Sequence, residues 1–387
     1  MGNRIDLQRP DAPDMAGFGP YAVGWRDWVV ETPPRPDLRA TGDGAVQMAP
    51  RRLRCAVWYP AQEQGAATPY RSTLRDGRQE AWLQGRGAEG AVAAEGRFPL
   101  VILSHGWPGN RFLMAHLGET LASRGHVVVA PDHPGSTYQD RLAGVADFGI
   151  TLLHRPWDQA FLIAAAAGAF SGMVEAACAA VVGYSMGGYG ALVSAGAGLS
   201  EAGIGWPGGA RADLVARHGE GVLQAVPGLR AIVAIGPWGA QHGFWSDAAL
   251  AAIRVPMLVI GGDGDDISGY HDGIRRVFER ATGSDRWLLT YHGAGHNAAA
   301  PIPAPAEAWV RVPWLEFPPF EHYADPVWDS VRMNNVAQHM IAAFLDRALR
   351  GADQGARLTP FDGGHPAGFG ETGAPGLRLE ARRAGQG

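Results

Sequence analysis

The stretch GYSMGGYG (183–190) lies between the apolar run AAVV and a helix-like segment, ALVSAGAGL. A serine that leaves a strand end with its hydroxyl pointing out of the sheet needs a sharp turn and strained backbone angles. Side chains two positions before and after it would collide with the neighbouring strand and helix, and Gly183 and Gly187 avoid this. The pattern therefore predicts that Ser185 lies on a strand-to-helix turn of the kind that carries a nucleophile.

Short apolar runs alternate with helical patterns along most of the chain. Each run has the length of a strand and is continuously apolar, whereas a half-exposed strand would alternate apolar and polar residues. This alternation is typical of the α/β class, a parallel sheet with helices on both faces. WRDWVVE (25–31) and LRCAVWYP (53–60) predict an antiparallel pair at the edge of the sheet. The apolar runs are 99–105, 126–133, 179–185, 229–238, 255–263 and 286–292, and the helical patterns cover 111–125, 155–170 and 268–282.

The alternation predicts one domain, residues 1–351, with three stretches that do not fit it. Residues 60–97 are rich in Gly, Ala, Gln and Arg and predict a surface excursion. Residues 199–228 are an insertion after the serine helix. Residues 299–323 combine prolines with aromatic residues directly after the last apolar run and its loop, and are a candidate lid.

The C-terminal part predicts one more helix and then a tail. Asp325 followed by Pro326 has the pattern of an N-cap with proline at the first helical position. Apolar residues recur at largely helical spacing as far as Leu349. Residues 352–387 are rich in Gly and Arg, with little apolar content, and are expected to form a loosely ordered tail.

Charge and composition exclude several classes of function. The formal net charge is -5 at pH 7 without a cluster of basic residues, which argues against a nucleic-acid partner. All 33 Lys and Arg residues are arginine, so Schiff-base chemistry and a Walker lysine are excluded. Cys55 and Cys178 lie in apolar contexts, which predicts reduced core residues. We expect a small-molecule substrate, no cofactor and no metal.

The sequence predicts no membrane span, because no segment approaches 18 uninterrupted apolar residues. Residues 1–20 lack the apolar core of a secretory signal. We therefore expect a cytoplasmic protein, with secretion as the alternative if a leader precedes this chain. These patterns do not determine the oligomeric state.

The serine turn and the order of the segments after it resemble the α/β-hydrolase superfamily. Within it, the chain resembles the branch of platelet-activating-factor acetylhydrolases, dienelactone-hydrolase-like proteins and bacterial polyester hydrolases. The resemblance spans roughly residues 50–350 and rests on motif order. It implies an α/β-hydrolase fold and a metal-independent serine esterase that forms an acyl-enzyme intermediate.

The resemblance also implies a catalytic triad in the order nucleophile, acid, histidine, with Ser185 first. The strand VPMLVI runs into GGDGDD, where the family's Gly-x-x-Asp turn, counted from Gly262, selects Asp265. The strand RWLLTY runs into HGAGHN, and GAGH matches the family's histidine loop, so His296 is the expected base. His296 would take the proton of Ser185, and Asp265 would hold the imidazole tautomer.

An oxyanion hole is implied as well. One donor would be the backbone N–H of Met186, the residue after the nucleophile. The second would be the N–H of Trp107, because SHGWPGNR resembles the family's His-Gly-x-x-Gly loop. An apolar acyl or aryl group is the expected occupant of the pocket. The candidates for the substrate pocket are His105, Gly106, Tyr184 and Trp238.

Three alternatives remain open. A dienelactone or polyester hydrolase of the same fold differs only in substrate. A binding protein with this fold and no turnover would keep Ser185 as an inactive turn residue. A zinc site from His292, His296 and nearby aspartates is disfavoured, because the hydrolase order already accounts for these residues. Asp158, in the sequence RPWDQ, is interpreted as a helix-start element paired with Arg155 and not as catalytic.

Overall fold

The computed structural model describes residues 2–40, 45–206 and 211–386. Its largest sheet contains β2 (Ala22–Glu31), β5 (Arg52–Ala61), β8 (Ala88–Glu89), β9 (Phe98–Ser104), β10 (Val127–Asp132), β11 (Val174–Tyr184), β12 (Leu229–Ile235), β13 (Met257–Gly262), β14 (Arg286–Tyr291), β15 (Phe361–Asp362) and β16 (Leu377–Arg382). The spatial order is β15-β16-β14-β13-β12-β11-β9-β10-β5-β2-β8. The strands from β14 to β10 in this order run parallel, whereas β5, β2 and β16 are antiparallel to their inner neighbours.

The apolar runs of the sequence form the parallel strands, as predicted. Every residue of β9, β13 and β14 is buried, because helices cover both faces and leave no strand face in water. The predicted antiparallel pair also forms, with Trp25 of β2 opposite Trp58 of β5. The α/β class with a mostly parallel sheet is confirmed.

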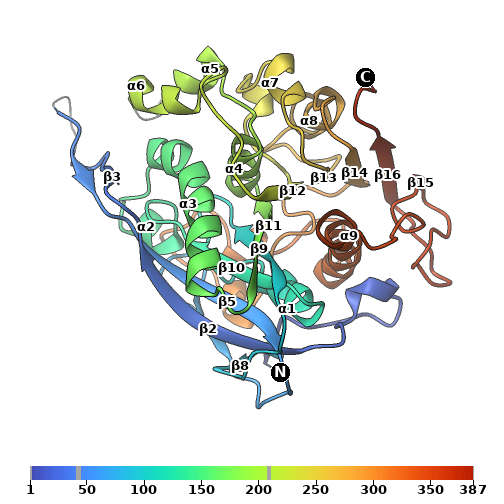
Figure 1. The fold of residues 1–387 in the computed structure, drawn as a ribbon. Helices are drawn as coiled ribbons and strands as arrows, with labels where there is room; N and C mark the ends of the chain where they lie inside the picture. Colours follow the sequence, from blue (N-terminus) through green and yellow to red (C-terminus); the bar gives the residue numbers. More distant parts are fainter. Residues whose placement is uncertain (1, 41–44, 207–210, 387) are drawn as a thin grey trace.

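Helices cover both faces of the sheet (Figure 1). They are α1 (Ala115–Ser123), α2 (Tyr138–Leu142), α3 (Phe148–Ala169), α4 (Met186–Ser194), α5 (Glu201–Ile204), α6 (Ala212–Val215), α7 (Asp247–Ala251), α8 (Arg276–Arg280) and α9 (Ser330–Arg350). Helices α1 and α9 share one apolar core with Val182 and Leu258, and α3, α4, α7 and α8 share the other with Val181 and Val259. Successive strand residues thus enter opposite cores, as the two-residue period of a strand requires.

Helix α3 begins earlier than its sequence pattern predicts. Its N-cap is Asp147, whose side chain accepts the N–H of Ile150. Pro156 lies inside the helix, and Asp158 is fully buried in its middle. The interpretation of Asp158 as a helix-start element is therefore wrong, because Asp147 already caps the helix before the proline.

Helix α9 begins later than predicted. Asp329 is its N-cap and accepts the N–H of Arg332. Asp325, the expected cap, accepts N–H groups of Val327 and Trp328 in the preceding turn. The same side-chain chemistry therefore closes a turn here and starts the helix one turn further on.

Residues 352–386 do not form the loosely ordered tail that composition predicts. Strand β16 pairs with β14 along its whole length, with Tyr291 opposite Leu377. Leu377 and Leu379 are buried in the core that contains α9. The prediction is wrong because two inward-facing leucines at alternate positions hold an edge strand, and an average composition hides them.

Residues 60–97 are more than a surface excursion. Strands β6 (Tyr70–Thr73) and β7 (Glu80–Gln84) form an antiparallel hairpin, and β1 (Asn3–Arg4) pairs with β7. Tyr70 and Leu83 are buried in the core that contains α1. The Tyr70 hydroxyl donates to Glu119 of α1 at 2.5 Å. The expectation fails because the inward residues of this hairpin alternate with Gln and Arg and do not form an apolar run.

The insertion 199–228 contains α5 and α6, and its residues 207–210 lie outside the described residues. Strands β3 (Arg35–Pro36) and β4 (Met48–Ala49) form a separate two-stranded sheet, which is not paired with the main sheet. Across the described part of the chain, no helix has the length and apolar character needed to cross a membrane.

Candidate active site

The predicted turn is present between β11 and α4. Ser185 has φ 53° and ψ -113°, a conformation that residues other than glycine rarely adopt. A Cβ atom on Gly183 would overlap the carbonyl oxygen of Gly187. A Cβ atom on Gly187 would overlap the carbonyl oxygen of Ser104, at the end of β9. Both glycines are therefore required by close backbone contacts on either side of Ser185.

The structure brings Ser185, His296 and Asp265 together from the ends of three parallel strands. Ser185 Oγ lies 3.0 Å from His296 Nε2, and His296 Nδ1 lies 2.8 Å from Asp265 Oδ2. The other carboxylate oxygen accepts the N–H groups of Ile267 and Ser268 at 2.9 Å and 2.8 Å. Because both oxygens of this buried carboxylate are bonded, the imidazole is held with Nε2 toward the serine hydroxyl.

Two neighbouring aspartates have other partners. Asp263 bonds His292 Nδ1 at 2.7 Å and accepts the N–H of Gly293. Asp266 lines the cavity described below. Of the three aspartates in this loop, Asp265 is thus the one that contacts His296. In the described ranges, no group of three His, Cys, Asp or Glu side chains is arranged to hold a metal ion.

The two predicted oxyanion donors lie beside Ser185. Met186 is the first residue of α4, where backbone N–H groups have no partner within the helix. Trp107 and Met186 both border the cavity that reaches Ser185. A Cβ atom on Gly106 would lie 3.3 Å from the Cβ of Ser185, so the loop that carries Trp107 approaches the serine directly.

His105 and Gly106, which were predicted to border the pocket, lie behind its wall. His105 is 1% exposed. Its Nδ1 donates to the carbonyl of Gly106 at 2.7 Å, and its Nε2 accepts the N–H of His133 at 3.2 Å. Burial lowers the pKa of His105 well below its usual range, so the ring is neutral. The prediction is wrong because the turn directs the imidazole back onto its own backbone and away from substrate.

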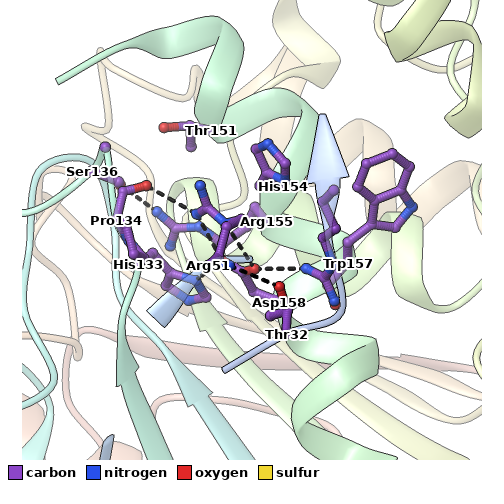
Figure 2. Close-up of polar contacts among 12 residues, drawn as sticks. Thr32, Arg51, His133, Pro134, Ser136, Thr151, His154, Arg155, Trp157 and Asp158 are labelled. Carbon is purple, nitrogen blue, oxygen red and sulfur yellow. Dashed lines mark hydrogen bonds and ion pairs between the residues drawn. The ribbon is translucent and has the colours of Figure 1, made fainter. Parts of the chain in front are cut away.

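A buried arginine of α3, Arg155, also contacts this loop. Figure 2 shows Arg155 beside Ser136. The Arg155 guanidinium donates to the carbonyl of His105 and, at 2.5 Å, to Ser136 Oγ. It also lies 3.5 Å from the carbonyl oxygen of Gly106. That carbonyl belongs to the same peptide unit as the N–H of Trp107, and the two groups of a trans peptide point in opposite directions. Bonds to the Gly106 carbonyl therefore orient the Trp107 N–H.

Asp158 lies on α3, the helix of Arg155, and bonds residues of neighbouring segments. Figure 2 shows its contacts with Arg51 and His133. Its carboxylate bonds Arg35 at 2.9 Å, Arg51 at 3.2 Å and His133 Nδ1 at 3.0 Å. His133 Nε2 in turn lies 2.9 Å from Ser104 Oγ. Burial raises the pKa of Asp158, but the charge of Arg51 and the bond to His133 outweigh it, and the pKa is lowered.

Burial lowers the pKa of His133 to about 3. His133 is therefore neutral, and its Nδ1–H donates to the Asp158 carboxylate. Ser104, His133 and Asp158 repeat the residue types of the Ser185 group, but the Ser104 side chain is fully buried. This second chain of hydrogen bonds fixes the strand end that precedes His105.

A cavity of about 940 Å³ opens at Ser185 and His296. Tyr184 and Trp238 line it, as predicted. Trp107, Phe148 and Trp238 form a continuous aromatic wall, with ring centroids 5.5 Å and 4.9 Å apart. The sequence pattern missed Phe148, because the beginning of α3 was expected further along the chain.

The candidate lid, residues 299–323, borders this cavity with Phe317, Phe320, Glu321 and His322. Asn297, which follows His296 in the chain, holds the C-terminal end of this segment beside the site. The Asn297 amide donates to the carbonyls of Glu321 and Ala324 at 2.7 Å and 2.8 Å. The Tyr184 hydroxyl donates to the oxygen of the same amide at 3.0 Å. The segment thus forms part of the cavity wall, and its movement as a lid stays a prediction.

The chain is similar to one known protein family and to solved structures of other proteins. Residues 86–143, which include the Trp107 loop, match the family model described as platelet-activating factor acetylhydrolase, isoform II. Among 731 matching chains of solved structures is the ferulic acid esterase from Streptomyces cinnamoneus, with TM-score 0.60 and 20% identity, covering 91% of this chain and 94% of that chain. The comparison with curated proteins gave no significant match. The chain has the α/β-hydrolase fold, and residues 86–143 are similar to the platelet-activating factor acetylhydrolase family.

Proposed function

We propose that the protein hydrolyses carboxylic esters, with Ser185 as nucleophile, His296 as general base and Asp265 as the orienting acid. The observation that carries the proposal is the continuous line of hydrogen bonds from Asp265 through His296 to Ser185, beside an apolar cavity. The strained backbone of Ser185 supports it further, because such strain is stored where it exposes a reacting group. The superfamily supports the same class of reaction.

In the proposed reaction, Ser185 Oγ attacks the ester carbonyl carbon while His296 Nε2 takes the hydroxyl proton. Asp265 stabilises the positive imidazolium that forms. The bond from the carbonyl carbon to the leaving oxygen then breaks, and His296 gives its proton to the departing alcohol. Water attacks the acyl-enzyme with His296 again as base, which releases the carboxylic acid and restores Ser185.

The negative oxygen of each tetrahedral intermediate would be bound by the N–H groups of Met186 and Trp107. Support for Met186 comes from its place at the beginning of α4. Support for Trp107 comes from the bond that His105 donates to the carbonyl of the same peptide unit. His105 and Arg155 are positioning residues in this proposal, since they act through the loop and do not contact substrate.

The aromatic wall favours an ester with an apolar acyl or aryl group. A cavity of about 940 Å³ is at the upper end of the usual range for one small-molecule ligand. A dienelactone or polyester hydrolase would use the same chemistry on other esters. A binding protein without turnover remains the alternative from another class.

A fluorophosphonate probe tests the proposal, because it labels an activated serine whatever the natural substrate is. We expect the wild-type protein to be labelled and Ser185→Ala to remain unlabelled with an unchanged circular dichroism spectrum. Hydrolysis of p-nitrophenyl esters by the variant should fall by about 10³-fold or more, because the oxyanion donors and the binding site alone remain. Near wild-type activity in Ser185→Ala would refute the assignment of the nucleophile, and an unlabelled wild type would favour the binding protein.

A further inference from the structure

One wall of the cavity carries a partly buried arginine, two of whose guanidinium nitrogen atoms are buried without a hydrogen-bond partner among the described residues. Arg75 lines the cavity together with Ser185 and His296. Its Nε and Nη1 atoms are buried, and neither has a hydrogen-bond partner within residues 2–40, 45–206 and 211–386. The guanidinium carbon lies 5.3 Å from the centroid of the Phe317 ring, which also lines the cavity. The apolar ring supports the guanidinium but offers no acceptor for its N–H groups.

Two hydrogen bonds hold the backbone that carries Arg75. Arg75 lies in the turn between β6 and β7, and its N–H donates to the Tyr323 hydroxyl at 3.1 Å. The carbonyl of the next residue, Asp76, accepts the indole N–H of Trp314 at 3.0 Å. Tyr323 and Trp314 both belong to residues 299–323, so two insertions of the fold meet at this turn. These contacts hold the backbone of the turn, and with it the Cα of Arg75, against residues 299–323.

The surroundings leave the positive charge of Arg75 unbalanced. Burial lowers the pKa of Arg75, which expresses the cost of keeping a charge away from water, although arginine stays charged at neutral pH. The neighbouring His322 adds no charge, because burial and then the charge of Arg75 lower its pKa well below its usual range. His322 Nε2 is bonded to the Tyr138 hydroxyl at 2.8 Å. A partly buried charge without a partner loses part of its solvation, and an anion bound beside it offsets that loss.

The cavity also contains three carboxylates, Asp266, Glu321 and Asp325. Asp325 accepts N–H groups of Gly295, Val327 and Trp328, and among the described residues none of the three carboxylates forms an ion pair with Arg75. Their negative field disfavours a doubly charged phosphate more than a singly charged carboxylate. The planar guanidinium also matches the two oxygens of a carboxylate.

We propose that Arg75 binds a free carboxylate group on the substrate while Ser185 attacks an ester group elsewhere in the same molecule. The inference rests on the proposed esterase function and names its substrate class, esters that also carry a carboxylate. The aromatic wall of Trp107, Phe148 and Trp238 then contacts the apolar part of the molecule between or beside these two groups.

Two pairs of esters test this inference, each pair differing in one charge. Butyrate esters of 4-hydroxybenzoate and 4-hydroxybenzamide place a carboxylate or a neutral amide in the leaving group. Monomethyl adipate and methyl adipamate place the same two groups in the acyl part. The measurement is kcat/KM of each ester for wild type, Arg75→Met and Arg78→Gln. Arg78 is the matched control, because it lies on the same turn but is exposed and packs against Trp314 at 4.5 Å.

We expect the wild type to prefer the carboxylate ester of at least one pair by about 10- to 100-fold, the usual contribution of hydrogen bonds to a charged group. Arg75→Met should lose this preference and keep its activity on the neutral esters within about twofold. Its melting temperature should not fall, since the substitution removes an unpaired buried charge. Arg78→Gln should retain the preference.

A wild type that hydrolyses neutral esters without preferring the carboxylates would overturn this inference and leave the esterase function intact. An equal loss of activity on charged and neutral esters in Arg75→Met, with a lower melting temperature, would assign Arg75 to packing and also overturn it. If the wild type hydrolyses none of the four esters and does not react with a fluorophosphonate, the proposed function fails, and the inference fails with it.

Discussion

In the loop after β13, the contacts of Asp265 differ from those of the two neighbouring aspartates, Asp263 and Asp266. Asp265 is fully buried and contacts His296, whereas Asp263 bonds His292. We expect Asp265→Asn to lower kcat by about 10⁴-fold, the size of the effect when the orienting acid of a triad is replaced. The melting temperature should change little, because asparagine keeps the size of the side chain and one acceptor oxygen.

The matched controls are Asp263→Asn and Asp266→Asn, which should keep substantial activity. Comparison of kcat for the three variants on one p-nitrophenyl ester decides between the aspartates. If Asp263→Asn or Asp266→Asn is the inactive variant, Asp265 does not have the proposed role.

At the level of elements, helix α3 links the core to the predicted oxyanion loop. Arg155 donates to the carbonyl of His105 and lies near that of Gly106, so its loss frees the peptide unit that carries the Trp107 N–H. We expect Arg155→Met to lower kcat by about 10- to 100-fold with a smaller change in KM, because an oxyanion donor acts in the transition state. Steady-state kinetics with a neutral ester measure the two constants separately.

Arg35→Met is the control for this effect. Arg35 bonds Asp158 at 2.9 Å and the carbonyl of Trp157 at 3.0 Å, both on the same helix, and unlike Arg155 it does not itself contact the carbonyls of His105 and Gly106. We expect this variant to lower the melting temperature and to keep kcat near the wild-type value. Equal losses of kcat in both variants would mean that α3 supports the site only through general stability.

Across the whole molecule, buried neutral histidines make stability sensitive to acid. Burial lowers the pKa of His116 to about 4 and the pKa values of His126, His133 and His154 to about 3. The unfolded chain titrates these groups near pH 6.5, so between about pH 6.5 and pH 4 it binds protons that the folded chain does not. Stability is therefore full above pH 6.5 and falls as the pH decreases, with each histidine contributing a slope of about 1.4 kcal/mol per pH unit.

We expect the melting temperature to decrease steadily from pH 6.5 to pH 4. The variant His126→Gln should flatten this decrease, whereas His271→Gln, at an exposed position, should leave the slope unchanged. Thermal unfolding in buffers of equal ionic strength measures it. A constant melting temperature over this range would show that these histidines become protonated in the folded protein.

The amino-acid sequence by itself determined the parallel strands, the turn at Ser185 and the order in which Asp265 and His296 follow. These features are local, because a buried strand, a tight glycine turn and a strand-end loop each depend on neighbouring residues. Parallel strands end at one edge of a sheet, so the order of the motifs was enough to predict that the three side chains meet there.

Only the tertiary structure decided which residues surround this group. Arg75 enters the cavity wall because its turn packs against residues 299–323, and Arg155 supports the predicted oxyanion loop from a helix far away in sequence. His105 turns away from the pocket for a similar reason, a bond to the N–H of His133. Such contacts join segments whose distance in space is set by the packing of the whole sheet and its helices, and no local pattern of residues encodes that distance.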